Sequence, residues 1–159
     1  MTGRVFQSLV TFSLCFLGTL VSTQICYDNQ WFIFRSVATG LAVDARDPTA
    51  VTLKGFDGSD YQQWKFQSSW PAGAYFIINK ASGNVLEIDA DKYVTTVPQD
   101  CLGAQQQTWF VYGDGRVGAW QGGDLESEND YLVDGARLRI SDQMNATVVQ
   151  FFVEEYVGV

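Results

Sequence analysis

The sequence predicts an all-β protein built from three copies of a unit about 45 residues long. Two observations carry this prediction. Short runs of β-branched and aromatic residues alternate with Gly, Asp, Asn and Ser, and a Gln-x-Trp or Gln-x-Phe tripeptide recurs at regular spacing. No stretch repeats apolar residues with helical spacing through three turns. Many short strands at intervals of roughly 8–12 residues indicate a sandwich or a barrel.

The tripeptide marks the end of each unit. Its three copies are Gln62-Gln63-Trp64, Gln107-Thr108-Trp109 and Gln150-Phe151-Phe152. The final aromatic residues are 45 and 43 residues apart. A single unit of this size cannot bury its apolar face, so three units are expected to share one core.

Two further markers keep the same register. The first is a strand of the form Leu-x-Val-Asp or close to it, which ends at Asp44, Asp89 and Asp134, 20, 20 and 18 residues before the aromatic residue. The second is Val51-Thr52-Leu53 in the first unit, which matches Leu138-Arg139-Ile140 in the third. Three markers in step support a true internal repeat, which one tripeptide alone would not.

From about residue 30 to residue 153, these repeats resemble the ricin-B-type lectin domain. The resemblance implies a β-trefoil with three pseudo-threefold repeats, in which twelve strands form a six-stranded barrel capped by three hairpins. It also implies that the tripeptide is mainly structural, with its aromatic residue in the core and its Gln hydrogen-bonded locally. The structural residues are then Gln62, Trp64, Gln107, Trp109, Gln150 and Phe152.

The resemblance also implies a sugar pocket in each unit. The family uses the Asp of the strand, an aromatic residue shortly after the next strand, and an Asn beside the Gln of the tripeptide. In the first unit Asp44 and Gln62 match, whereas Lys54 stands near the aromatic position and Tyr61 stands at the Asn position. Phe56, two residues after Lys54, could replace the aromatic residue, because an aromatic face can stack on a sugar ring.

The other two units match the family pattern less well. In the second, Asp89 and Gln107 match, but Gln99 and Gln106 occupy the aromatic and Asn positions. In the third, Asp134 and Gln150 match, but the other two positions hold Asp142 and Val149. No unit has the full set, and the first is the best preserved. The candidate carbohydrate-binding residues are Asp44, Phe56, Tyr61, Gln62, Asp89 and Gln107.

Several residues have a competing structural interpretation. An Asp after a strand often caps a turn, which is the role we favour for Asp134; for Asp44 the ligand and turn roles both stay open. Trp70 and Trp120 could be exposed ligand platforms, but we expect them to pack over an end of the barrel. The acidic run 124–130 could offer oxygens to Ca²⁺, but it lacks EF-hand spacing, and we expect a solvated loop.

The first 23 residues have the layout of a secretory signal peptide rather than a membrane anchor. One domain, residues 24–159, would remain, and secretion would place it outside the cell. Two cysteines remain with it, Cys26 and Cys101, and an even pair in a secreted chain indicates a disulfide rather than two free thiols. Asn145 begins the only N-x-Thr/Ser sequon and is a candidate glycosylation site.

Composition excludes several function classes. The chain has no His, so Ser-His-Asp and Cys-His nucleophilic sites and His-ligated metals are ruled out, and no metal or cofactor is predicted. A net charge of −8 argues against nucleic-acid binding, and no second apolar run could insert into a membrane. A pair of carboxylates is all that remains for catalysis, and we expect no enzymatic activity.

The sequence therefore predicts a secreted, non-catalytic lectin module. The resemblance implies galactose, N-acetylgalactosamine or related glycans as ligands, so the expected partners are glycans or glycoproteins. A single competent unit would bind weakly, so avidity would then require a homo-oligomer. The alternative is a secreted trefoil that binds proteins, such as a protease inhibitor, with degenerate sugar sites and a protruding loop within residues 113–130.

Overall fold

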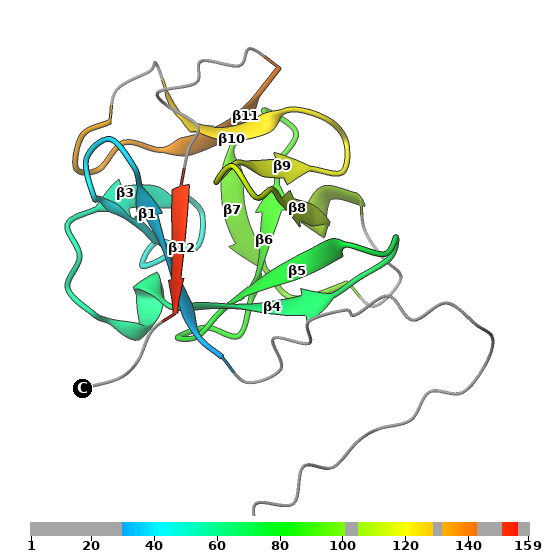
Figure 1. Cartoon of the computed structure of the whole chain (residues 1–159), viewed down its shortest axis with the longest axis horizontal. Helices are drawn as coiled ribbons and strands as arrows, with labels where there is room; N and C mark the ends of the chain where they lie inside the picture. The colour runs from blue at the N-terminus through cyan, green and yellow to red at the C-terminus, as the bar shows by residue number, and fades with distance from the viewer. Residues whose placement is uncertain (1–29, 101–104, 129–131, 143–150, 156–159) are drawn as a thin grey trace, which may run out of the picture.

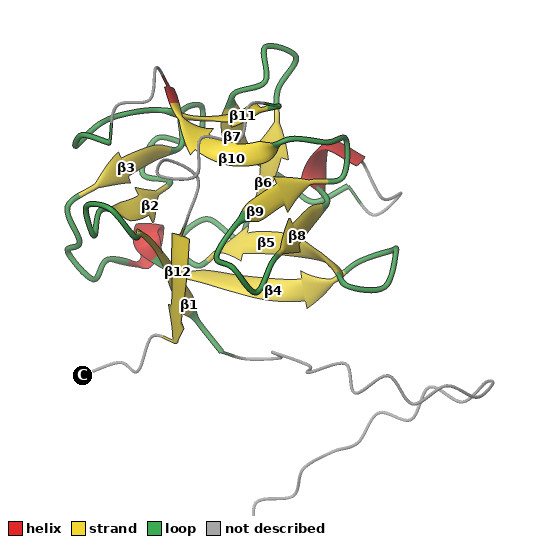
Figure 2. Cartoon of the chain, turned by 45° about the horizontal axis from the view of Figure 1, so that its top comes forward, coloured by secondary structure: helices red, strands yellow, loops and turns green. Residues whose placement is uncertain are grey.

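The computed structural model describes residues 30–100, 105–128 and 132–142, together with the backbone of residues 151–155. Strands and connecting loops make up nearly all of this part of the chain, and helix is confined to short segments (Figure 2). The elements are β1 (Phe32–Ser36), β2 (Ala42–Asp44), β3 (Thr52–Lys54), η1 (Asp60–Gln62), β4 (Trp64–Ser68), β5 (Ala74–Asn79), β6 (Val85–Ile88), β7 (Val94–Val97), η2 (Gln105–Gln107), β8 (Trp109–Val111), β9 (Val117–Ala119), β10 (Asp124–Ser127), β11 (Leu138–Ser141) and β12 (Phe151–Glu155). The all-β prediction is confirmed.

All twelve strands belong to one antiparallel sheet (Figure 1). The main path runs β11-β10-β9-β8-β5-β4-β1-β2-β3, while β6 joins at β5, β7 joins at β6, and β12 pairs with β1. The pairing of β12 with β1 brings the two ends of the domain together along five residues. This closure leaves fewer unpaired strand edges, which would otherwise invite pairing with another chain.

Each of the three units contributes one pair of neighbouring antiparallel strands, β2–β3, β6–β7 and β10–β11, and we call these pairs hairpins. Backbone hydrogen bonds join them in a ring. Val51 N donates to Val94 O at 3.1 Å, Leu138 N donates to Val51 O at 2.9 Å, and Ile140 N donates to Lys92 O at 2.8 Å. Each unit therefore contributes one hairpin to a shared cap, and each hairpin depends on its neighbours for hydrogen bonds.

The core is one cluster of apolar side chains drawn from all three units. Trp64 and Trp109, the aromatic residues of the first two tripeptides, are fully buried in it. Phe34 and Phe66 pack edge to face with ring centroids 5.6 Å apart. The core role predicted for the two Trp residues is confirmed. The backbone of Phe152 pairs with Arg35, but its side chain lies outside the described residues, as does Gln150.

The sequence predicts a solvated acidic loop over residues 124–130, and this prediction is wrong for the part that the structure describes. Residues 124–127 form β10, in which Asp124 and Glu126 are buried. Arg116 pairs with Asp124 at 3.1 Å and Arg139 pairs with Glu126 at 2.8 Å, so each buried carboxylate has a cation from a neighbouring part of the sheet. Within the described ranges, no three His, Cys, Asp or Glu side chains gather as metal ligands.

Two other expectations also change. Trp70 does not pack over an end of the barrel: it lies in the turn between β4 and β5 and is 81% exposed, because this hairpin extends beyond the body of the fold. The segment expected to be a protruding inhibitor loop contains, within its described residues 113–128, the two strands β9 and β10 joined by a turn. No helix among the described residues is long or apolar enough to cross a bilayer.

Candidate functional site

Asp44, the first candidate ligand, ends β2 directly opposite Thr52 of β3. Its side chain is only 2% exposed. Asp44 Oδ1 accepts a hydrogen bond from Arg46 N at 2.8 Å, and Asp44 Oδ2 accepts one from Gln62 Nε2 at 3.1 Å. The turn role left open by the sequence is therefore present, because the bond to Arg46 N fixes the start of the β2–β3 turn.

Gln62 holds this carboxylate in place. Its Nε2 also donates to Gly55 O at 2.9 Å, and its Oε1 accepts from Asp57 N at 2.9 Å. The side chain is fully buried, and it joins the strand, the loop after β3 and the tripeptide in one network. The local hydrogen bonding predicted for Gln62 is confirmed, and it also orients Asp44.

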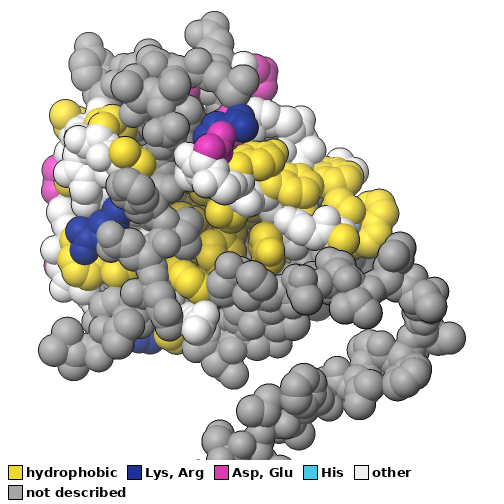
Figure 3. Space-filling model, in the orientation of Figure 1, with side chains coloured by type: hydrophobic (Ala, Val, Ile, Leu, Met, Phe, Trp, Pro, Cys, Tyr) yellow, Lys and Arg dark blue, Asp and Glu magenta, His cyan; other side chains and the backbone are white. Residues whose placement is uncertain are grey.

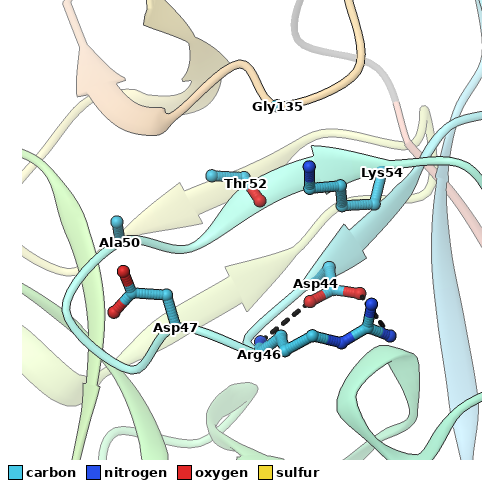
Figure 4. Close-up of a pocket in the computed structure, with 7 residues that line it drawn as sticks. All are labelled: Asp44, Arg46, Asp47, Ala50, Thr52, Lys54 and Gly135. Carbon is cyan, nitrogen blue, oxygen red and sulfur yellow. Dashed lines mark hydrogen bonds and ion pairs between the residues drawn. The ribbon is translucent and has the colours of Figure 1, made fainter.

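A hollow of about 290 Å³ lies over this network. Most of its wall comes from the β2–β3 hairpin, and a loop of the third unit faces it (Figure 4). The lining residues are Asp44, Arg46, Asp47, Ala50, Thr52, Lys54 and Gly135. The hollow therefore lies in the first unit, where the sequence best preserves the family's sugar pocket. The third unit supplies the rest of its wall.

The lining offers hydrogen-bond groups of every kind. Thr52 has a hydroxyl that can donate or accept, Lys54 has an ammonium that only donates, and Asp47 has a carboxylate that accepts. Asp44 accepts one hydrogen bond on each oxygen within the protein, and the Arg46 guanidinium lies 3.7 Å from Oδ2, so the carboxylate keeps acceptor capacity that a ligand would share with this cation. Such a mixed set suits a ligand rich in hydroxyl groups. No aromatic ring lines the hollow, because Lys54 stands where the family has one.

Ion pairs fix the two cations of the pocket. Arg46 donates to Asp57 Oδ2 at 2.6 Å, and this bond, with those from Ser59, lowers the pKa of Asp57 to about 2. Lys54 donates to Asp134 Oδ1 at 3.1 Å. The pocket therefore holds two cations that are already neutralised by carboxylates, which favours a neutral ligand over a strongly charged one.

Phe56 and Tyr61, proposed as stacking faces, lie beside the hollow rather than in its wall. They are 39% and 40% exposed, so each presents part of its ring to solvent. A cation covers each ring: the Arg35 guanidinium lies 4.0 Å from the Phe56 centroid, and that of Arg46 lies 5.4 Å from the Tyr61 centroid. Tyr61 therefore reaches the pocket only through Arg46.

In the second unit the acid that Gln107 binds is Glu87 rather than Asp89, which the sequence matched to Asp44. Gln107 Nε2 donates to Glu87 Oε2 at 2.8 Å, and Glu87 faces Thr95 as Asp44 faces Thr52. Asp89 instead caps a turn, because its Oδ1 accepts from Asp91 N and Tyr93 N, both at 2.9 Å. The acid lies 20 residues before the Gln in the second unit and 18 residues before it in the first. Because side chains alternate between the two faces of a strand, a shift of two residues keeps the acid on the same face.

The rest of the second network repeats the first. Gln107 Oε1 accepts from Asp100 N at 2.9 Å, and Gln107 Nε2 also donates to Pro98 O at 3.3 Å. Trp109 Nε1 donates to Leu86 O at 3.0 Å, as Trp64 Nε1 donates to a strand carbonyl in the first unit. The Gln and Trp of both tripeptides therefore perform the same structural task.

The third unit contributes to the first rather than forming a described pocket. Asp134 Oδ2 accepts from Gly55 N at 3.0 Å, and this bond, followed by the one from Lys54, lowers the pKa of Asp134. The structural role favoured for Asp134 agrees with these contacts, although the turn it caps belongs to another unit. Three residues for which the sequence predicts a disulfide or glycosylation, Cys26, Cys101 and Asn145, lie outside the described residues.

Sequence reasoning missed most of the pocket wall. Arg46, Asp47 and Gly135 carry no mark of the repeat, and Gly135 approaches only through the packing of two units. Thr52 could have been found, because it lies two residues before Lys54 and side chains two apart in a strand share a face. Glu87 could have been found by testing the strand register shifted by two residues.

Comparisons with known proteins agree with this fold. The family model for the ricin-type beta-trefoil lectin domain-like family matches residues 60–140, half of the chain. No curated protein matches the sequence. Many solved structures share the fold, among them the following three.

The designed threefold-symmetric protein ThreeFoil is 21% identical, with a TM-score of 0.70 over 79% of this chain and 99% of its own. The C-half of the earthworm R-type lectin, solved with GalNAc, is 16% identical, with a TM-score of 0.67 over 80% and 99% of the two chains. The Macrolepiota procera ricin B-like lectin, solved with lactose, is 15% identical, with a TM-score of 0.66 over 79% and 94%. The fold is a β-trefoil, and the chain belongs to the ricin-type β-trefoil lectin domain-like family.

Proposed function

We propose that the chain is a non-catalytic carbohydrate-binding module and that its glycan site is the hollow of the first unit. One observation carries the proposal: Asp44, which Gln62 holds in place, lies in the wall of a polar hollow at the position of the family's sugar pocket. The expected ligands are galactose, N-acetylgalactosamine or related neutral glycans. The structures of two family members with GalNAc and lactose support this class of ligand.

Binding would work by hydrogen bonds rather than by stacking. The remaining acceptor capacity of Asp44 and the hydroxyl of Thr52 would take sugar hydroxyls, and Lys54 would donate to a sugar oxygen. Without an aromatic ring in the wall, a single sugar would bind weakly, and several sites or a homo-oligomer would be needed for tight attachment.

A glycan array on the mature protein tests the proposal. Thr52→Val provides the sharper test, because it removes one hydroxyl at constant side-chain size. We expect it to weaken binding of the best array ligand roughly fivefold to tenfold, the worth of one hydrogen bond. Thr95→Val is the matched control, because Thr95 faces Glu87 in the second unit as Thr52 faces Asp44. A silent array, or equal binding by Thr52→Val and wild type, would refute the proposal.

We also propose that the module is secreted after cleavage near Thr23, with a disulfide between Cys26 and Cys101 and a glycan on Asn145. These three proposals rest on the sequence. Intact mass spectrometry of the secreted protein, before and after reduction and deglycosylation, tests all of them. An unprocessed N-terminus, free thiols or an unmodified Asn145 would each contradict the corresponding proposal.

A further inference from the structure

Four aromatic side chains form a continuous row on a part of the surface that the pocket does not use. They are Trp70, Trp120, Phe110 and Tyr112, and we call them the aromatic ladder. Neighbouring ring centroids are 5.9, 5.8 and 6.4 Å apart. Figure 3 shows a band of hydrophobic side chains on the side of the molecule where the β4–β5 and β8–β9 hairpins lie.

The rings are exposed rather than part of the core. Trp70 is 81% exposed and Tyr112 is 41% exposed, while Trp120 and Phe110 between them are partly buried. Phe110 lies at 26° to Trp120 and at 23° to Tyr112. Planes this close to parallel, with centroids this far apart, must be displaced sideways by about 4–5 Å, because touching rings stack at about 3.5 Å. Much of each ring face therefore stays uncovered by its neighbour.

The backbone holds the two Trp residues in tight turns. In the β4–β5 turn, Ser69 N donates to Ala74 O and Ala74 N donates to Pro71 O, both at 2.9 Å. At the other Trp, Trp120 N donates to Thr108 O at 2.9 Å. The backbone that carries both Trp side chains is thus held in place before any ligand arrives, which lowers the entropy lost on binding.

A glycine makes room for the last ring. A Cβ atom on Gly118 would lie 2.8 Å from Cε2 of Tyr112, so only glycine lets this ring lie against β9. The Arg116 guanidinium covers the Tyr112 ring at 4.9 Å from its centroid and is itself paired with Asp114 and Asp124. The row therefore ends in polar groups that can hydrogen-bond with a bound ligand.

We propose that the aromatic ladder is a second carbohydrate-binding surface, one that takes an extended, neutral polysaccharide chain along the row, with sugar rings packed on the exposed Trp70 ring and on the uncovered parts of the rings that follow it. This inference rests on the proposed carbohydrate-binding function and adds a ligand class to it. The C–H face of a sugar ring packs on an aromatic face. Because neighbouring ring centroids are 5.8–6.4 Å apart, a chain of linked sugar rings can contact more than one aromatic ring at once.

The same observations disfavour other occupants. The chain carries a net charge of −8, so anionic lipids and nucleic acids would be repelled. A stable protein partner would need a broad face of about 800 Å² on each side, whereas the ladder is a single file of rings that ends in an ion-pair cluster. A chain-like ligand therefore fits this single row of rings better than the broad surface of a protein partner does.

Native gel electrophoresis in gels cast with neutral soluble polysaccharides tests the inference. Hydroxyethylcellulose, arabinoxylan, galactomannan and laminarin would serve as probes. We expect at least one to retard the protein, and the hexasaccharide of that polymer to bind more tightly than its disaccharide. Trp70→Ala should weaken this binding roughly three- to tenfold, the worth of one aromatic contact, and Trp70→Phe should restore most of it.

Two controls keep the ladder and the pocket separate. Val133→Ala truncates another exposed apolar side chain, 56% exposed on the third unit, and should leave retardation unchanged. Thr52→Val should weaken binding of small glycans but not of the polymer. Thermal melting should show that Trp70→Ala folds like wild type, because the side chain it removes is largely outside the core.

Four results would overturn the inference. The first is that no polymer retards the protein, and the second is that Trp70→Ala and wild type are retarded equally. The third is that only Thr52→Val loses retardation. The fourth is that the protein is a dimer, which Trp70→Ala converts to a monomer. The third result would show that the polymer binds in the pocket, and the proposed function would still hold. If the array ligands bind normally while the polymers do not, only the ladder proposal fails.

Discussion

Replacing Gln62 with Ala tests the structural role of the tripeptide most sharply. The Gln62 side chain makes three hydrogen bonds to groups that are otherwise out of reach of water or only partly exposed to it. The Gln62→Ala variant leaves Asp57 N and Gly55 O without these partners. It also leaves the buried carboxylate of Asp44 with only the bond from Arg46 N and the more distant Arg46 guanidinium.

The cost follows from these three bonds. The two bonds to neutral groups are worth about 1 kcal/mol each, and the bond to the Asp44 carboxylate is worth about 1.5–3 kcal/mol. Together they give about 3.5–5 kcal/mol, and water entering the space left by the side chain reduces the expected loss to about 3 kcal/mol. For a domain of this size, that lowers the melting temperature by roughly 10 °C.

Urea unfolding followed by Trp fluorescence measures this loss. Gln67→Ala is the matched control, because Gln67 is an exposed Gln on the following strand. Gln107→Ala should behave like Gln62→Ala, since Gln107 makes the equivalent three bonds. If Gln62→Ala costs less than about 1 kcal/mol yet abolishes glycan binding, then Gln62 is a ligand rather than a support, and the reasoning fails.

Three further changes follow from single contacts. Trp64→Phe should cost about 2–3 kcal/mol in urea unfolding, because it removes core volume and the bond from Trp64 Nε1 to Val43 O at 3.1 Å. Gly123→Ala should cost more than about 2 kcal/mol by the same measurement, because φ is +87° and the new Cβ would lie 2.5 Å from a neighbouring methyl group. The bond from Arg46 helps to lower the pKa of Asp57 from 3.8 to about 2. The ionised Asp57 should therefore contribute its full stabilisation of the fold above about pH 4. That stability is lost as the pH falls through 2, and Asp57→Asn should flatten the acid limb of a melting-temperature profile.

Each of these expectations has a contrary result. Wild-type stability in Trp64→Phe would mean that the indole bond contributes nothing. A Gly123→Ala variant that melts with wild type would mean that the loop adjusts freely. Identical acid limbs for wild type and Asp57→Asn would show that the Arg46 pair is open to solvent and contributes no net stability, as many exposed ion pairs do.

The architecture was predictable because its signals are local and repeated. Alternating strand patterns and the buried Trp64 and Trp109 follow from residue type and spacing, and each marker occurs in more than one unit. The acid of the second unit was not predictable in the same way. Asp89 and Glu87 both lie on or near the same face, because they are two residues apart, and only the hydrogen bond from Gln107 separates them.

The wall of the pocket was harder still to predict. Asp134 reaches Gly55 across 79 residues, and Gly135 faces the hollow from the same loop, so both depend on how two units pack. Trp70 was misjudged for a different reason. An exposed Trp and a packed Trp look alike in sequence, and the reach of the β4–β5 hairpin beyond the body of the fold decides between them.

The hollow of the first unit is the proposed site for a neutral glycan. A ¹H–¹⁵N NMR titration of the mature protein with the best array ligand, or with lactose if the array ranks galactosides highest, tests it most directly. The largest amide shifts should fall on four residues that line the hollow: Arg46, Thr52, Lys54 and Gly135. Shifts confined to other residues, or no shift at millimolar ligand, would contradict it.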